Sequence, residues 1–422
     1  MIEIQTKKNI AKIFAEEPDK QTKQQIATIA RNPDYADTKI RVMPDTHVGR
    51  DCVIGMTMTL HGRVSPSLVG VDIGCGMEVV KLQEQEIDLP GLDAYIHTYI
   101  PAGKRIHQDP IIEAQHFPFH EMVCYSEIDL ERCIRSMRTL GGGNHFIEID
   151  RDHDGTLYLV IHSGSRSLGG AVANYYRDEA YKYHCKKARR NVRVEKRDRW
   201  DMETEGFDLS RFGIDAYGDD CHTSSRQSVT KASRRDGQGK LPVKWECATC
   251  EGKLYEDYLH DQEIAVRFAI ENRKQIALSI CTGMGLHPTE SYSCVHNYID
   301  ADHILRKGAI SARQGEFVFI PFNMRDGAII GRGLGNPDWN FSAPHGAGRV
   351  CSRTDAKHAY EVEVYQEIMK EAGVFTTTAN KETLDECPMA YKSMDRILPY
   401  LTECVEIESH VRPIYNFKAG ES

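Results

Sequence analysis

The chain has 422 residues, of which 41% are hydrophobic and 27% are charged, values typical of a soluble protein that can bury a sizeable core. Its formal net charge of −9 argues against a whole-surface affinity for nucleic acid and leaves only a local basic groove open. No run of about 18 apolar residues occurs, and charges interrupt the N-terminus where a secretory signal needs an apolar segment, so we expect a cytoplasmic protein without a membrane span.

The hydrophobic pattern predicts a short helix near the N-terminus, then short strands separated by glycine-rich loops, and then a long helix. Residues 22–33 (TKQQIATIARNP) predict a short amphipathic helix that ends at Asn-Pro. Apolar runs then predict strands at 53–60, 78–82 and 155–163. Residues 253–280 carry apolar side chains at helical spacing without glycine or proline, which predicts one long helix.

The C-terminal third predicts strands at 317–323 and 328–333, followed by a helix over 359–373 that stops at a glycine. Because strands and helices mix without a regular β-α-β alternation, we expect an α+β fold. The segment 186–252 differs from the rest, since it is polar, basic and rich in Ser, Asp and Arg. We interpret it as a surface insertion.

The cysteines and the basic stretch at 181–200 give only weak evidence for a metal site or for a nucleic-acid contact. Thirteen cysteines without framework spacing indicate free thiols. Cys247 and Cys250 form a lone C-x-x-C, which is weak evidence for zinc because a further ligand such as Cys221 or His222 would be needed. Lys and Arg are dense over 181–200, a pattern most often found on the solvated face of a helix.

Four glycine-rich or strand-end settings each carry residues able to bind a metal. One histidine at a strand end is most often a hydrogen-bonded structural residue, but the four settings together supply a thiolate, a carboxylate and three imidazoles. Such a set suits Mn, Co or Zn better than Mg or Ca. Five ligands exceed one tetrahedral site and a thiolate can bridge, which favours two ions and phosphoryl chemistry. The candidate ligands are Asp72, Cys75, His145, His162 and His296.

His345 stands in SAPHGAGRV (342–350), where small residues surround a bulky, ionisable ring. Two explanations stay open from the residues alone. Either the loop turns sharply and the histidine has no special role, or the small residues beside it leave space for a large group to reach the ring.

Seven motifs occur in the order found in the RtcB family of RNA 3′-phosphate ligases. They are VMPDTHVG, GVDIGCGM, GGGNHFIEI, HSGSRSLG, VHNY, APHGAGRVCSR and RPIYNFK, and they run from residue 42 to residue 418. The chain therefore resembles that family over nearly its whole length. Because ligands spread over such a span must converge on one site, the resemblance implies a single mixed α/β domain (1–422) with 186–252 as an insertion within it.

The resemblance implies an activity and its partners. Members join RNA ends that carry a 2′,3′-cyclic phosphate or 3′-phosphate to 5′-hydroxyl ends, using GTP and Mn²⁺. The reaction passes through a covalent histidine–GMP intermediate and then RNA(3′)pp(5′)G. The expected substrates are tRNA or other structured RNA with broken ends, and an accessory activator protein is a further candidate partner.

The resemblance also implies a role for each matching residue. The five candidate ligands would hold two Mn²⁺ ions, with Cys75 bridging. His345 would be the nucleophile that takes GMP from GTP, and Asp45 would orient it, a role that suits an imidazole because its neutral form is available near neutral pH. Tyr391 and Lys418 would contact the guanine. The full set of nucleotide contacts would be Asn144, His145, Phe146, Ile147, Glu148, His296, Asn297, Asn323, His345, Gly346, Ala347, Gly348, Tyr391 and Lys418.

One stretch departs from the family. Where members commonly have Pro-Gly-Ser-Met-Gly, this chain reads IPFNMRDGAIIGRG (320–333), which puts strict use of GTP in doubt. Two other hypotheses therefore accompany the ligase. One is a divergent metal-dependent phosphoesterase or RNA-end-processing paralogue that has lost ligation. The other is a non-catalytic RNA-binding paralogue, against which the intact His345, Asp45 and ligand set argue.

Overall fold

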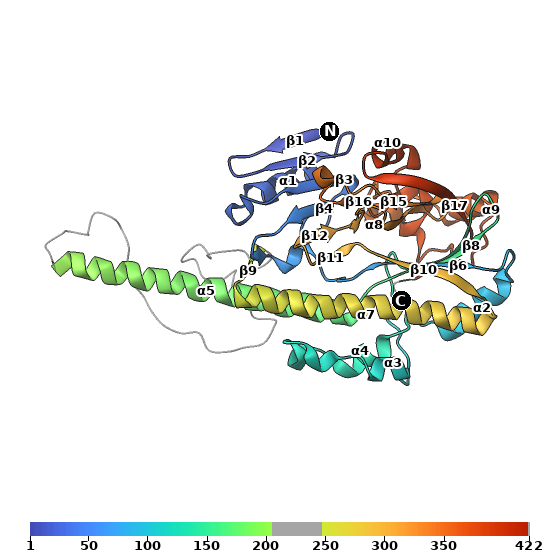
Figure 1. Cartoon of the computed structure of the whole chain (residues 1–422), viewed down its shortest axis with the longest axis horizontal. Coiled ribbons are helices and arrows are strands. Elements are labelled where there is room, and N and C mark those ends of the chain that lie inside the picture. The colour runs from blue at the N-terminus through green and yellow to red at the C-terminus, as the bar shows by residue number, and fades with distance from the viewer. Residues whose placement is uncertain (205–246, 421–422) are drawn as a thin grey trace.

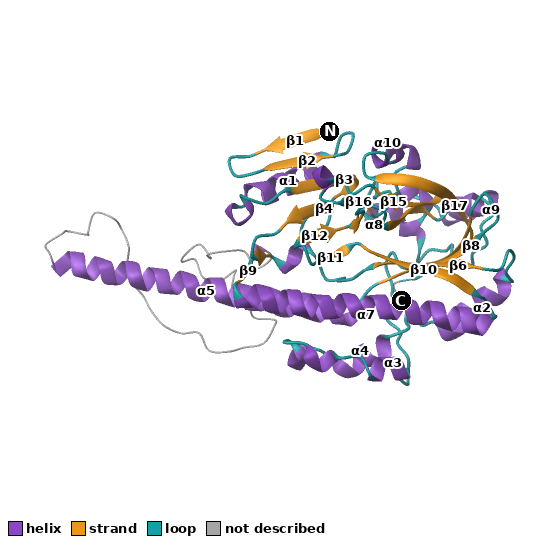
Figure 2. Cartoon of the chain, in the orientation of Figure 1, coloured by secondary structure: helices purple, strands orange, loops and turns teal. Residues whose placement is uncertain are grey.

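A computed structural model describes residues 1–204 and 247–420 of the chain. Two sheets occupy its centre, and long helices run along one side of them (Figures 1 and 2). The smaller sheet has six strands in the spatial order β1 (Ile2–Gln5), β2 (Ile10–Ile13), β3 (Ile40–His47), β4 (Ile54–Thr59), β12 (Ile304–Lys307) and β11 (Asn297–Ile299). Of the pairs inside it, β2–β3 is parallel and the others are antiparallel.

The larger sheet has seven strands and is antiparallel throughout. Their spatial order is β10 (Pro288–Val295), β6 (Gly76–Leu82), β8 (Leu157–Ser163), β7 (Phe146–Arg151), β17 (Val405–Lys418), β15 (Gly327–Gly333) and β14 (Phe317–Asn323). The long strand β17 pairs with β15 along its first half and with β7 along its second, so it joins the two halves of the sheet. Two short pairs, β13 (Ala309–Ser311) with β16 (Ser342–Pro344) and β5 (Arg63–Val64) with β9 (Cys250–Glu251), complete the described strands.

The predicted helices and strands are present, with ends shifted by a few residues. The α-helices in the described part of the chain are α1 (Lys20–Arg31), α2 (Leu89–Tyr99), α3 (Ile112–Gln115), α4 (Leu130–Ser136), α5 (Ser167–Thr204), α7 (Lys253–Met284), α8 (Arg353–Ala359), α9 (Val362–Glu371) and α10 (Leu398–Leu401). Helix α1 begins after Asp19, whose carboxylate caps the first turn, and α7 ends at Gly285 in the left-handed conformation. The helix predicted over 359–373 begins later, at Val362, because Tyr360 is extended and separates it from α8.

The predicted α+β class is confirmed. The two faces of the larger sheet are used differently, because side chains alternate along each strand. On one face Ile147, Leu159 and Ile161 pack with Ile276 and Ile280 of α7 in a hydrophobic cluster. Each such buried side chain stabilises the fold by about 1.5–3 kcal/mol relative to exposure. On the opposite face Val79, Phe146 and Val160 belong to a second hydrophobic cluster, and Glu148 and His162 lie among them.

The segment predicted to be an insertion begins inside α5 and ends beside β9. Its middle, 205–246, lies outside the described residues, and so do Cys221 and His222, the further ligands that a zinc site at Cys247 and Cys250 would need. Cys250 is buried, and its thiol donates to the carbonyl of Tyr176 at 3.8 Å. Among the described helices, none is both long and apolar enough to cross a bilayer.

Candidate active site

Strands β7 and β8 direct the site residues. Phe146, Glu148 and His162 lie on the face opposite α7, since they alternate with Ile147 and Ile161. Phe146 pairs directly with His162 across the two strands, and the two rings lie 5.3 Å apart. The strand alternation thus turns an imidazole and a carboxyl group toward one side of the sheet.

Three candidate metal ligands converge at the end of these strands. The sulfur of Cys75 and one nitrogen each of His145 and His162 all lie within 4.8 Å of one another. Cys75 Sγ is 3.5 Å from His145 Nε2 and 3.2 Å from His162 Nε2. Asp72 Oδ2 is 3.2 Å from His145 Nε2, and the ring of His296 lies 5.2 Å from that of His162.

In this cluster, His145 and His162 each point the Nε2 atom of the ring toward Cys75. His145 Nδ1 lies 2.8 Å from the carbonyl of Leu140, and His162 Nδ1 lies 3.1 Å from that of Asn144. Because a carbonyl only accepts, each Nδ1 carries a proton, and each Nε2 faces Cys75 as a potential ligand. A proton or a cation must lie between such electron-pair donors, and a bound metal would replace the protons.

Burial supports the same assignment. Burial and the Asp72 carboxylate raise the pKa of the Cys75 thiol well above its usual value, so a thiolate there needs a cation beside it. Burial, and then neighbouring positive charge, hold the pKa of His162 and of His296 well below the usual range, so both rings are neutral. His296 Nδ1 is buried without a hydrogen-bond partner. The donor set therefore fits a first-row metal such as manganese or zinc.

Helix α7 fixes the loops that carry these residues. The buried guanidinium of Arg273 donates to the carbonyls of Gly74 and Ser163, both at 2.8 Å. Its neighbour Asn272 donates to the carbonyl of Gly164 at 3.3 Å. A Cβ on Gly74 would lie 2.8 Å from the Cβ of Ala269, so only glycine allows this loop to sit against the helix.

His345 and Asp45 form a pair beside the cluster. Asp45 Oδ2 lies 2.6 Å from His345 Nδ1 and also accepts the backbone N–H of His345 at 3.2 Å. Asp45 is fully buried, whereas the His345 side chain keeps 17% of its surface exposed. The carboxylate thus holds the proton on Nδ1 and leaves the Nε2 lone pair free. The His345 ring lies 4.9 Å from that of His296.

Local backbone geometry brings this pair together. Strand β3 changes register against β4 between Val42 and His47, and Asp45 lies in that irregular stretch. His345 follows β16 directly. Gly348 has φ +76°, and a Cβ there would lie 1.9 Å from the carbonyl oxygen of Asp45, so the turn after His345 requires glycine. The sharp turn is therefore present, and the ring of His345 is partly exposed.

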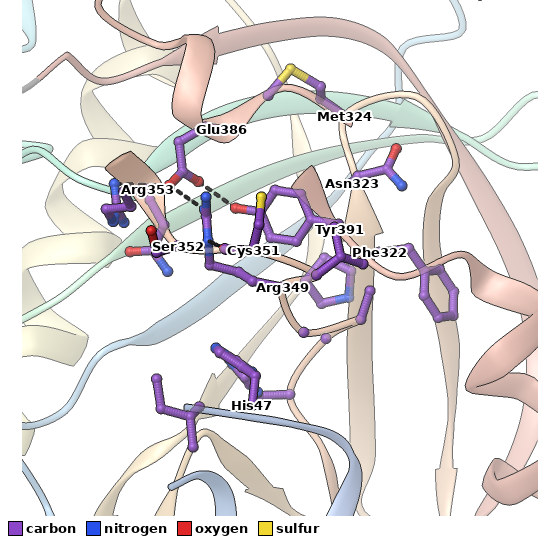
Figure 3. Close-up of a pocket in the computed structure, with 18 of the residues that line it drawn as sticks. His47, Phe322, Asn323, Met324, Arg349, Cys351, Ser352, Arg353, Glu386 and Tyr391 are labelled. Atoms are coloured by element: carbon purple, nitrogen blue, oxygen red, sulfur yellow. Dashed lines mark hydrogen bonds and ion pairs between the residues drawn. The ribbon is translucent and has the colours of Figure 1, made fainter. Parts of the chain in front are cut away.

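A cavity of about 740 Å³ opens in front of His345, a volume suited to a nucleotide. Phe322, Asn323 and Met324 line one side of it, and Arg353 and Glu386 lie on the other (Figure 3). The predicted site residues that line it are Asn144, Phe146, Glu148, His162, Asn323, His345, Gly346, Ala347, Gly348, Tyr391 and Lys418.

Some predicted nucleotide contacts lie elsewhere. Ile147 is fully buried on the opposite face of the sheet, because it neighbours Phe146 and Glu148 along a strand. The amide of Asn297 donates to the carbonyl of Asp72 at 3.3 Å and accepts from the N–H of Gly308 at 3.0 Å, so it fixes loops. His145, His296 and Asn297 are not among the cavity-lining residues.

Asn323 lines the cavity, but its side chain shapes its own turn. Its Oδ1 accepts the backbone N–H groups of Arg325 at 3.0 Å and Asp326 at 2.9 Å, and its Nδ2 donates to the Asp326 carboxylate at 2.8 Å. Phe322 beside it is buried. The departure from the family motif is therefore a self-contained hairpin turn at the cavity wall.

Two of the lining residues that were not predicted from the sequence, His47 and Glu386, contact predicted site residues. His47 Nδ1 lies 2.9 Å from the carbonyl of Asp45, and burial lowers the pKa of the ring to about 4, so it is neutral. Glu386 is buried and contacts Tyr391, Lys418 and an arginine pair. The acidic pair before PMAYK was the only signal of Glu386, and nothing local indicates that such a carboxylate is buried.

Comparisons with known proteins agree with this geometry. A family model described as tRNA-splicing ligase RtcB matches residues 25–127 and 103–419. RNA-splicing ligase RtcB1 of Escherichia coli strain ATCC 25922 is 29% identical, with 93% of this chain and 92% of that protein covered. RNA-splicing ligase RtcB of Escherichia coli K12 has the same identity and coverage. tRNA-splicing ligase RtcB of Aeropyrum pernix is 25% identical, with 84% and 82% covered. The chain belongs to the RtcB family.

Proposed function

We propose that this protein is an RNA ligase that joins 2′,3′-cyclic phosphate or 3′-phosphate ends to 5′-hydroxyl ends, using GTP and Mn²⁺. Its substrates would be tRNA or other structured RNA with broken ends. The observation that carries the proposal is the Asp45–His345 pair, which lies at the wall of a nucleotide-sized cavity and adjoins a cluster of buried metal-binding side chains. The names of the similar proteins support RNA ligation.

His345 would act as the nucleophile. Its Nε2 attacks the α-phosphorus of GTP, a P–N bond forms, and the bond to the pyrophosphate breaks. The ring then carries a positive charge, which the Asp45 carboxylate stabilises across the 2.6 Å contact to Nδ1. The same hydrogen bond fixes the tautomer, so that in the neutral ring the proton lies on Nδ1 and Nε2 carries the lone pair.

Two transfers to RNA would follow. Water first opens a cyclic end to a 3′-phosphate. An oxygen of that phosphate attacks the histidine-bound phosphorus, the P–N bond breaks, and His345 returns to its neutral form. The 5′-hydroxyl then loses its proton and attacks the RNA phosphate, GMP leaves, and the new phosphodiester joins the strands.

Asp72, Cys75, His145, His162 and His296 would hold two Mn²⁺ ions, with Cys75 bridging. When bound, such ions supply Lewis-acid stabilisation of the charged phosphates. Burial keeps His162 and His296 neutral and therefore able to bind a cation. The backbone carbonyls that accept from His145 and His162 orient both rings.

Different lining residues would contact the phosphates and the base of the nucleotide. Gly346, Ala347 and Gly348 would border the phosphates, since they follow His345 and leave room beside its ring. Tyr391 and Lys418, which both line the cavity, would contact the guanine. Glu148 lines it as well and accepts from Asn416 at 2.7 Å.

A phosphoesterase that has lost ligation is the second candidate. The observation in its favour is the turn at Asn323, whose polar atoms bind within the turn and which replaces a family motif at the cavity wall. Such an enzyme would use the same metal cluster but would form no nucleotide adduct. A binding protein without catalysis needs neither the Asp45–His345 pair nor the buried ligands.

Incubation with α-labelled GTP and Mn²⁺ tests the proposal. We expect acid-labile label on the protein, and none on His345→Ala. His287→Ala is the matched control, because His287 is an exposed histidine that pairs with Glu84 and is not among the cavity-lining residues. This variant should take up label like the wild type. Absence of label on the wild type would refute the ligase. A labelled protein that opens cyclic phosphates and joins no RNA would favour the second candidate.

A further inference from the structure

The cavity-lining residues Tyr391 and Lys418 both contact one buried carboxylate, that of Glu386. Glu386 ends the 3-10 helix η8 (Leu384–Glu386) and has 1% of its surface exposed. Its Oε2 accepts the hydroxyl of Tyr391 and lies 3.2 Å from Lys418 Nζ. Its Oε1 lies 3.0 Å from Arg349 Nη1 and 2.8 Å from Arg353 Nη1. Figure 3 shows this carboxylate facing the Tyr391 hydroxyl.

The surroundings keep Glu386 ionised. Burial alone would raise its pKa, but the positive charges of Lys418, Arg353 and Arg349 outweigh that effect and lower the pKa below its usual value. An ionised carboxylate only accepts hydrogen bonds. Every group around Glu386 must therefore turn a proton toward it.

This requirement fixes what Tyr391 and Lys418 offer to the cavity. Tyr391 has one hydroxyl proton and gives it to Glu386, so its oxygen presents only lone pairs elsewhere. Lys418 gives one proton to Glu386 and another to the carbonyl of Asn144 at 2.9 Å, which leaves its third proton for a ligand. The cavity wall thus presents an acceptor on Tyr391 and a donor on Lys418.

Guanine and adenine differ in which of their base atoms donate hydrogen bonds and which accept them. Guanine carries an O6 acceptor beside its N1–H donor, whereas adenine carries an N6 amino donor beside its N1 acceptor. A donor on Lys418 and an acceptor on Tyr391 match the first pattern and oppose the second. A site built to satisfy one polarity rejects the other strongly, because buried polar groups would be left unpaired.

We infer that Glu386 is a positioning residue that selects guanine over adenine by fixing the hydrogen-bond polarity of Tyr391 and the position of Lys418. The inference rests on the proposed function and deepens it. Glu386 acts through its neighbours and need not touch the base. Its charge sets the direction of the Tyr391 hydrogen bond, which a tyrosine alone leaves open, and it holds the Lys418 ammonium, which only donates, in place.

Glu386→Gln tests the inference, because the amide keeps the shape and allows Tyr391 to turn its proton into the cavity. Labelling rates with α-labelled GTP and ATP give kcat/KM for each nucleotide. We expect the GTP-to-ATP ratio to fall at least about tenfold, through KM and not kcat, since only binding of the base changes.

Asp261→Asn is the matched control. Asp261 is equally buried and accepts from Val123 N at 2.8 Å, Cys124 N at 2.9 Å and Tyr176 OH at 2.8 Å, but it lies outside the cavity. Its loss should lower the thermal midpoint and leave the GTP-to-ATP ratio unchanged. A general loss of stability is thereby separated from a change in base choice.

Each outcome of these experiments either supports or overturns the inference about Glu386. A wild-type ratio in folded Glu386→Gln would overturn the inference. If that variant fails to fold, Tyr391→Phe replaces it, since this change removes the acceptor and keeps all four charges; an unchanged ratio there overturns the inference equally. A wild type that labels equally with both nucleotides also contradicts it. A wild type that takes no label from GTP refutes the proposed function itself.

Discussion

Asp45→Asn removes a negative charge that lies 2.6 Å from His345 Nδ1 and leaves the shape of the side chain intact. The amide oxygen can still accept both N–H groups of His345, so the ring should keep its orientation. What the variant loses is the attraction between the carboxylate and the positive ring that forms during nucleotide transfer.

The size of the effect follows from that charge pair. Two unit charges about 4 Å apart attract by about 4 kcal/mol at an effective dielectric constant of about 20. The neutral amide retains part of this as an ordinary hydrogen bond, so we expect a loss of about 2–4 kcal/mol in transition-state stabilisation. That corresponds to labelling that is slower by about 30- to 1,000-fold.

Rapid-quench labelling with saturating GTP and Mn²⁺ measures this rate, and equilibrium dialysis measures GTP binding separately. We expect binding to change little, because Asp45 is fully buried behind the ring. A variant that labels at the wild-type rate would refute the role given to Asp45. A variant that fails to bind GTP would show that Asp45 shapes the cavity and does not assist the reaction.

Three further predictions concern metal, backbone and pH. Cys75→Ala should lose bound manganese as well as labelling, measured by elemental analysis of the dialysed protein; full metal content would contradict a bridging thiolate. Gly348→Ala should destabilise the fold by at least about 1–3 kcal/mol in urea unfolding, because φ is +76° and its Cβ would strike the Asp45 carbonyl; equal stability would refute that geometry. Burial raises the pKa of Glu148 to about 7, so its contribution to stability is complete below about pH 4.5 and is lost as pH rises to 7. Glu148→Gln should flatten that decline in unfolding free energy, and an unchanged pH profile would contradict the assignment.

Much of the fold follows from local pattern. The helix at Lys253–Met284 and the strands at Leu157–Ser163 and Phe317–Asn323 were predictable because each carries one clear hydrophobic period. The boundary at Tyr360 was not, since the helical pattern runs through it and only its extended backbone ends α8. Periodicity therefore predicts which elements exist more reliably than where they stop.

The part of the candidate site that could be predicted is the part where the residue types themselves indicate the chemistry, as cysteine and histidine do for metal binding. Cysteine and histidine beside glycine predicted a metal cluster, and Cys75, His145 and His162 do converge. Ile147 was placed at the nucleotide by its position in a motif, although strand alternation turns it away from Phe146 and Glu148. Motif membership and side-chain direction are separate properties.

Glu386 could not have been found in the same way. Its environment is assembled from η8, the end of β17 and the turn after His345, which lie far apart in the chain. A carboxylate in a linear sequence is most often exposed, and only tertiary contacts make this one a buried acceptor for four donors. Polarity of this kind belongs to the folded structure.

Peptide mapping by mass spectrometry, after incubation of the wild-type protein with GTP and Mn²⁺, tests the central claim most directly. The account predicts one GMP adduct, on the peptide that contains SAPHGAGR, with fragment ions placing it on His345 and with loss of the adduct in acid. An adduct on a lysine, or a protein that stays unmodified while RNA ends are joined, would contradict it.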